Sequence, residues 1–188
     1  INKASNITLF DINKPLITKV KEKYSMTHGI NCVEYDVIDE IPEMYKNSFD
    51  VVSINPPWYY DYYKLFIIRA LQMLNNAHKD IIIPLFPLLS KRNAIKELVQ
   101  LFEFLGSIGC YNIESLGYVE FEMPLFEKKA LEEKGIPIPD ANWRNAELVK
   151  LSFNNTEIEN NSLHIDIHDH IKWESKITKS NKLFLINE

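Results

Sequence analysis

Short apolar runs alternate along the chain with stretches in which apolar residues recur at helical spacing. The runs have the length and β-branched content of strands, and they lie at residues 6–10, 31–35, 49–54 and 80–85. The helical stretches lie at residues 15–24, 62–74 and 95–105. Strands that alternate with helices in this way form parallel sheets with helices on both faces. The pattern therefore predicts an α/β fold with a mostly parallel sheet.

Two details of this pattern concern the burial of single elements. The run at 49–54 is almost continuously apolar, which is typical of a strand that is buried on both faces. For the helix after Ser90, the pattern predicts a broad inner stripe of apolar side chains: Ile95, Leu98, Val99, Leu101, Phe102 and Leu105. Both elements are expected to contribute to the core.

The pattern changes after residue 110. Residues 111–121 and 147–153 read as two antiparallel strands, and the long connection between them contains a helical patch at 126–134. A polar stretch at 154–162 separates them from two further strand-like runs at 163–168 and 182–186. We therefore expect one α/β domain over residues 1–153 and a strand-rich extension of the same domain over residues 154–188.

Composition narrows the class of protein. The 188 residues are 46% apolar, enough for one substantial core, and the formal charge of −5 lacks the basic excess of a self-sufficient nucleic-acid binder. Cys32 and Cys110 are far apart and apolar in context, which is typical of reduced thiols in a cytoplasmic protein. No apolar run approaches the roughly 18 residues of a membrane span. The composition favours a cytoplasmic protein that binds no membrane; a nucleic-acid partner stays open, through a local basic patch, but the overall charge does not favour it.

Polar residues follow the predicted strands at the edge where parallel sheets bind ligands. Asp11 follows the first strand and can accept two hydrogen bonds from a ribose diol. Asp36 follows the second and can accept a hydrogen bond from an adenine amino group. The alternative is that each is a helix cap or an exposed loop acid, because aspartate is favoured at such turns.

The loop Asn55-Pro56-Pro57-Trp58 follows the third strand and has the strongest chemical character in the sequence. The two prolines fix the backbone and remove two donors, so the loop presents rigid acceptors. The Asn55 side-chain oxygen and the Pro56 carbonyl can accept both hydrogens of an amino group, while Trp58 packs against a flat or cationic substrate. The alternative is a tight turn with the tryptophan in the core.

Four tyrosines surround the start of the next helix. We expect Tyr59 or Tyr60 to lie near the substrate, whereas other tyrosines of the group belong to the core of the helix. The basic pair Lys91-Arg92 is interpreted as a solvated helix end.

The order of these motifs resembles that of class I S-adenosylmethionine-dependent methyltransferases, especially those that methylate amino groups. The resemblance covers roughly residues 6–153 and implies a Rossmann-like sheet of seven strands with a terminal antiparallel strand. It also implies S-adenosylmethionine as the cofactor, with Asp11 at the ribose, Asp36 near adenine, and Asn55 to Trp58 around the target nitrogen. The same region is similar to branched-chain polyamine synthases, which share the aspartate and Pro-Pro-aromatic arrangement.

One part of the family pattern is absent from the chain. The family places a first strand and a glycine-rich loop before the ribose acid, and neither precedes Asp11. Only five glycines occur in all. We therefore expect an amino-terminally truncated domain, with the missing segment cut off, disordered or supplied by a partner chain.

Three functions follow from the sequence. The leading hypothesis is methylation of a nitrogen on a small-molecule or macromolecular acceptor. The second is aminopropyl transfer from decarboxylated S-adenosylmethionine to a polyamine, and the third is a catalytically silent scaffold subunit. No metal is expected, because the cluster His164, Asp166, His168, Asp169 and His170 fits the solvated face of an edge strand better than a metal shell.

Overall fold

The computed structural model describes residues 6–24, 30–75, 79–88, 91–123, 125–138, 145–154, 173–177 and 182–186. The chain divides into two compact units, Ile1–Pro42 and Glu43–Glu188. The domain boundary predicted at residue 153 is a separate question and stays a prediction. Each unit is described by itself.

The first unit is a single β-α-β motif. Strand β1 (Ile7–Asp11) pairs in parallel with β2 (Ile30–Glu34), and α1 (Lys14–Tyr24) connects them. The side chain of Asn13 accepts a hydrogen bond from the Leu16 amide at 3.1 Å, so it caps the amino-terminal end of α1. Both strands and the helix lie where the sequence predicts them, within about one residue.

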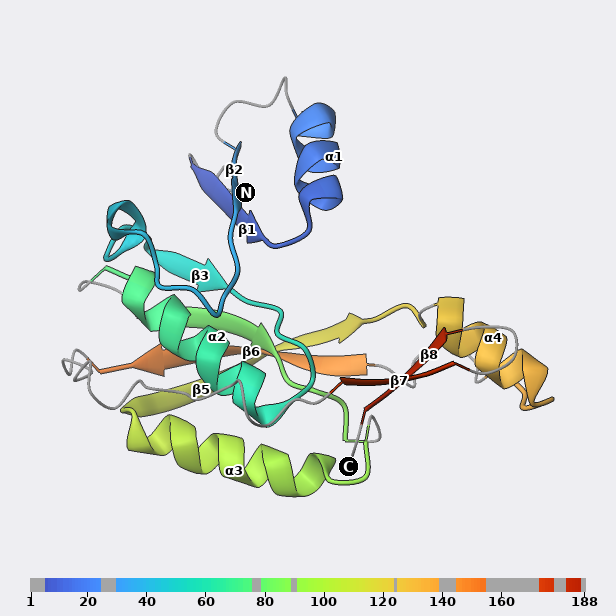
Figure 1. Ribbon diagram of the computed structural model, residues 1–188. Coiled ribbons are helices and arrows are strands. Elements are labelled where there is room, and N and C mark those ends of the chain that lie inside the picture. The colour runs from blue at the N-terminus through green and yellow to red at the C-terminus, as the bar shows by residue number, and fades with distance from the viewer. Residues whose placement is uncertain are drawn as a thin grey trace. The chain divides into compact units, whose positions relative to one another are not determined.

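A four-stranded sheet forms the centre of the second unit (Figure 1). Its strands are β3 (Val51–Ser53), β4 (Asp80–Pro84), β5 (Cys110–Glu120) and β6 (Asn145–Phe153). The spatial order is β3-β4-β6-β5. Strand β6 is antiparallel to both neighbours, whereas β3 and β4 are parallel. The predicted antiparallel pair is therefore confirmed, and its second strand lies inside the sheet.

Two helices cover one face of this sheet. Helices α2 (Tyr60–Met73) and α3 (Ala94–Ser107) lie side by side (Figure 1) and contribute to one hydrophobic core. Ile81 and Ile83 of β4 face this core, as do their register partners on β6. Residues on the opposite face form polar pairs: Ser152 donates to Asp80 at 2.7 Å, and Lys150 lies 2.6 Å from Glu114. The parallel strands and their connecting helices confirm the Rossmann-like α/β class.

The rotation of α3 differs from the predicted inner stripe. Leu101 and Leu105 are buried as predicted, and Ala94 joins them, but three predicted core residues are exposed: Ile95, Val99 and Phe102. Apolar side chains occupy more than half of the helix circumference, so the sequence pattern does not fix which sector faces the sheet.

Strand β3 also differs from its prediction. It lies at the edge of the four-stranded sheet, and Val51 and Ser53 are exposed rather than buried on both faces. A nearly continuous apolar run identifies a strand, but it does not determine the place of that strand in the sheet.

The remaining described elements are short. They are a 3₁₀ helix at Glu43–Tyr45, α4 (Leu125–Glu133), and an antiparallel hairpin of β7 (Trp173–Ile177) and β8 (Lys182–Ile186). Gly135 ends α4 with a φ of 64°, a conformation that glycine adopts without strain. The run at 163–168 and the cluster from His164 to His170 lie outside the described residues.

Both cysteines are free thiols, in line with the sequence analysis. Among the described residues, no helix is long and apolar enough to cross a membrane.

Candidate active site

The Asn55–Trp58 loop lies directly after β3 and before α2, at the edge of the sheet where the parallel strands end. The amide of Ile54 donates to the Ile82 carbonyl at 2.9 Å, which fixes the start of the loop to β4. At the other end, the Tyr59 amide donates to the Pro57 carbonyl at 2.7 Å, so the chain turns sharply into α2. The loop is thus anchored at both ends.

Within the loop, Asn55 and Pro57 are exposed, whereas Pro56 is buried. The Asn55 side chain forms no hydrogen bond with any residue in the described part of the chain. Its amide oxygen therefore retains its full capacity to accept hydrogen bonds from an amino group. This is the capacity that the predicted role of Asn55 requires.

Trp58 is half-buried, and its ring packs against the hydrophobic core. The ring meets Phe121, which follows β5, in an edge-on contact with 5.4 Å between centroids. This contact fixes one edge of the indole, as the alternative of a core tryptophan requires. The residue as a whole is partly exposed.

Of the tyrosines around the start of α2, one belongs to the core, as expected for part of this group; the predicted place of Tyr59 or Tyr60 near a substrate stays a prediction. Tyr63 is fully buried, and its hydroxyl donates to the Pro84 carbonyl at 2.7 Å. Burial raises the pKa of the Tyr63 phenol well above its usual value. Tyr59 and Tyr60 are half-buried at the start of the helix. Burial also raises the pKa of Tyr59, and the nearby Glu97 carboxylate raises that pKa further.

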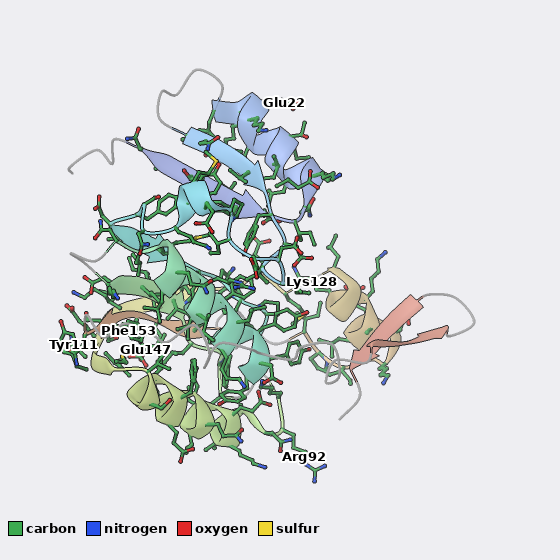
Figure 2. All side chains as sticks on the ribbon, turned by 60° about the vertical axis from the view of Figure 1, so that its left-hand side comes forward. Glu22, Arg92, Tyr111, Lys128, Glu147 and Phe153 are labelled. Carbon is green, nitrogen blue, oxygen red and sulfur yellow. The ribbon has the colours of Figure 1, made fainter. Side chains whose placement is uncertain are left out.

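The structure corrects the interpretation of the basic pair Lys91-Arg92 as a solvated helix end, and it adds Glu97, which the sequence did not single out. Arg92 is exposed, as expected for a helix end, and Figure 2 shows its side chain projecting away from the fold. Lys91 instead turns inward: its Nζ donates to the Trp58 carbonyl at 2.5 Å and forms an ion pair with Glu97. The sequence shows two adjacent basic residues, and no signal there distinguishes the inward from the outward one.

Asn145 is a further polar residue at this edge of the sheet. It is the first residue of β6 and lies opposite Glu120, the residue before Phe121. Its Oδ1 is buried and accepts no hydrogen bond from the described residues. A buried amide oxygen without a donor is rare in folded proteins, so Asn145 is a candidate acceptor for a substrate N–H.

In the first unit, Asp11 and Asp36 lie at the carboxyl ends of the two paired strands. The Asp11 carboxylate accepts the Asn13 amide at 2.7 Å, and the Asp36 carboxylate accepts the Ile38 amide at 3.0 Å. Both acids therefore stabilise local turns, as the alternative interpretation requires. Each carboxylate retains an oxygen that accepts no hydrogen bond from the described residues.

Carboxylate oxygens can accept hydrogen bonds from the diol and the amino group of a nucleoside, because both groups are hydrogen-bond donors. A glycine-rich turn that could bring the backbone close to the rest of such a ligand is not among the described residues. The described residues also contain no group of three or more potential metal ligands. The structure therefore contains two strand-end carboxylates in the first unit and, in the second unit, a loop with an exposed amide side chain.

Comparison with known proteins gives a consistent picture. The family model of the branched-chain polyamine synthase A C-terminal domain matches residues 1–110. The branched-chain polyamine synthase from Thermus thermophilus, solved with N4-aminopropylspermidine and 5'-methylthioadenosine, has a TM-score of 0.63 at 13% identity, over 82% of this chain and 46% of that one. An S-adenosylmethionine-dependent O-methyltransferase from Thermotoga maritima has a TM-score of 0.51 at 11% identity, over 82% of this chain and 52% of that one.

A curated relative, an uncharacterised protein of Methanocaldococcus jannaschii, is 35% identical over 75 residues, which are 39% of this chain and 19% of that protein. The chain thus spans about half of the solved relatives and about a fifth of the curated one. The similarities to the two solved structures confirm that this chain has a Rossmann-like fold.

Proposed function

Since the chain belongs to the family of the branched-chain polyamine synthase A C-terminal domain, we propose that it is part of a transferase that moves an aminopropyl group from decarboxylated S-adenosylmethionine to an amine of a polyamine. The match over residues 1–110 carries this proposal. That segment includes both strand-end acids and the whole Asn55–Trp58 loop, so all residues predicted for the site belong to the matched part.

The donor supplies the chemistry: its sulfonium makes the adjacent methylene carbon electrophilic. The amine nitrogen forms a bond to that carbon, the carbon–sulfur bond breaks with its electron pair going to sulfur, and a proton leaves the nitrogen to solvent. The loop has a defined part in this step. The Asn55 amide oxygen and the Pro56 carbonyl accept the amine hydrogens, which aims the lone pair at the carbon.

Polyamines are long cations, and two features favour them as acceptors. Trp58 is partly exposed, and an indole ring is a side chain that binds an ammonium or an alkyl arm. The formal charge of −5 favours the approach of a polycation. In the first unit, Asp11 and Asp36 would hold the ribose and adenine of the donor through their remaining carboxylate oxygens.

Nitrogen methylation, the leading hypothesis from the sequence, becomes the second candidate. An amine-accepting loop serves either reaction, and the similarity to the Thermotoga maritima enzyme concerns the fold alone. The family match favours aminopropyl transfer, because the matched family is that of a polyamine synthase.

The test uses the full-length protein, incubated with spermidine and either S-adenosylmethionine or its decarboxylated form. Mass spectrometry of the polyamine product distinguishes an added aminopropyl group from an added methyl group. We expect aminopropyl addition with the decarboxylated donor and release of 5'-methylthioadenosine. Methyl addition would establish the second candidate, and no product with either donor, from protein that binds both substrates, would favour the scaffold hypothesis.

A further inference from the structure

Three consecutive residues after the two prolines are held by one pair of side chains. The Lys91 Nζ donates to the Trp58 carbonyl at 2.5 Å and lies 5.2 Å from the centroid of the Tyr59 ring. Glu97 Oε2 accepts the Tyr60 amide at 3.1 Å. Lys91 and Glu97 also form an ion pair with each other. Lys91 therefore contacts the carbonyl of Trp58 and the ring of Tyr59, and Glu97 binds the amide of Tyr60.

The local sequence supplies few hydrogen bonds to this segment beyond the one from the Tyr59 amide to the Pro57 carbonyl. Pro56 and Pro57 have no amide hydrogens, so the loop lacks two donors that could pair within the turn. Tyr59 occupies the cap position of α2 and forms no side-chain capping bond. The first amides of a helix need acceptors, and a negative charge there is favourable. Glu97, from the first turn of α3, provides both.

The environment makes the pair stronger than a surface ion pair. The side chains of Lys91 and Glu97 are only 20% and 23% exposed. The Lys91 ammonium also lies 4.5 Å from the centroid of the Phe86 ring, which shields it from water. Loss of one partner of such a pair leaves the other charge partly buried without compensation. The two side chains therefore act as a unit.

We infer that Lys91 and Glu97 are positioning residues, which hold Trp58 to Tyr60 so that the amine-accepting loop keeps its shape before the acceptor arrives. Neither side chain bonds to Asn55 or to the Pro56 carbonyl in the structure, so neither is assigned to the reacting atoms. The inference rests on the proposed function for its kinetic consequence. Its structural consequence, order in the loop, is independent of any reaction.

The kinetic test uses the full-length protein with Lys91→Met and Glu97→Gln, and the neighbouring Arg92→Met as the matched control. Loss of the pair should raise the KM for the polyamine by roughly tenfold and lower kcat. A less ordered loop would bind the polyamine in several orientations, and only a few of these place its nitrogen for reaction. The KM for the nucleoside donor should stay unchanged. Lys91→Arg should restore most of the activity, since a guanidinium can bind both the carbonyl and the carboxylate.

The structural test is hydrogen exchange, measured by mass spectrometry on peptides covering residues 58–64 and, as an internal reference, residues 80–85. We expect Lys91→Met and Glu97→Gln to speed exchange in the first peptide by about tenfold and to leave the second unchanged, as local opening does. Arg92→Met should change neither peptide. If Lys91→Met unfolds the protein, Glu97→Gln and Lys91→Arg still provide both measurements.

Two results would overturn the inference: exchange in residues 58–64 of Lys91→Met that equals exchange in Arg92→Met, or a loss of activity that appears equally in the KM values of donor and acceptor. An absence of all transfer activity in the unsubstituted protein would refute the proposed function instead. The exchange measurement would then still decide whether the pair holds the loop.

Discussion

Asn55 and Trp58 are three residues apart, yet the structure gives them different surroundings. The Asn55 amide is exposed and forms no hydrogen bond within the described part of the chain, whereas the Trp58 ring is half-buried against Phe121. A free acceptor gains most when the amine becomes positively charged in the transition state. A packed ring contributes similarly to the ground state and the transition state.

The two residues should therefore differ in the kinetic effect of their loss. Asn55→Ala should lower kcat by roughly 10² to 10³, with donor affinity nearly unchanged, as removal of one preorganised contact does. Trp58→Ala should mainly raise the KM for the acceptor. Single-turnover kinetics of the full-length protein measure both. Full activity of Asn55→Ala would reduce the loop to a structural turn.

Asp11 offers a test of the nucleoside site. Its carboxylate already accepts the Asn13 amide, and its remaining oxygen is predicted to accept the ribose diol. Loss of a hydrogen bond to a charged group costs about 1.5 to 3 kcal/mol, so Asp11→Ala should weaken binding of 5'-methylthioadenosine by roughly 10- to 150-fold. Calorimetry on full-length protein checks this, with the exposed Asp39→Ala as the control. Equal affinities in the two variants would remove Asp11 from the site.

Tyr63 links a residue of the core to the pH dependence of stability. Burial raises its pKa in the folded state above the ordinary value of 10.0. The unfolded phenol ionises near pH 10 while the folded one stays protonated, so its stabilising contribution is complete below pH 10 and is lost as the pH rises further. Tyr63→Phe should cost about 1 kcal/mol at pH 7 through the lost bond to Pro84, and should unfold with a shallower pH dependence above pH 10. Urea unfolding at pH 7 to 11 measures both effects.

At the level of elements, the positions of β1 to β6 and α1 to α4 followed from the sequence more closely than their orientations, whereas β7 at Trp173–Ile177 was not predicted. Periodicity located α3, because apolar residues recur every three or four positions. The sector that faces the core did not follow, since Ile95 and Val99 are as apolar as Leu98 and Leu101. Packing against the sheet determines which sector of α3 faces the core, and the sequence pattern of the helix alone does not.

The observed rotation of α3 makes a direct prediction for stability. Leu101 is fully buried, so Leu101→Ala should cost about 2 to 5 kcal/mol through lost burial and a residual cavity. Val99 is 52% exposed, and Val99→Ala should cost well under 1 kcal/mol. Thermal or urea unfolding of the two variants measures both losses in the free energy of unfolding. Similar losses for both would mean that the helix is rotated toward the predicted stripe.

The candidate site was predictable to the extent that it follows strand ends. Asp11, Asp36 and Asn55 were identifiable because ligands bind where parallel strands end, and each residue follows a strand. Lys91 and Glu97 were not, because their partners lie 33 and 37 residues away in sequence. Only the packing of α2 beside α3 brings these groups together.

At the scale of the whole molecule, the core belongs to one unit. The hydrophobic cluster lies entirely within the second unit, whereas the described residues of the first unit include only three buried apolar side chains: Ile17, Cys32 and Ile41. Chains of about 40 residues rarely bury enough surface to fold without staples. Residues 1–42 alone should therefore be largely unfolded by circular dichroism, and residues 43–188 alone should unfold cooperatively. Cooperative unfolding of the isolated first segment would contradict this division.

The place of β6 inside the sheet bears on how the chain is made. Asp80 of β4 accepts a hydrogen bond from Ser152 of β6, which is synthesised 72 residues later. At a synthesis rate of about 5 to 20 residues per second, roughly 4 to 14 s pass between the synthesis of β4 and that of β6. Over that time the apolar run Ile81 to Ile83 lacks one of its two native neighbours. A nascent chain of this protein is therefore most prone to aggregate between the synthesis of β4 and that of β6, the interval in which a chaperone would act.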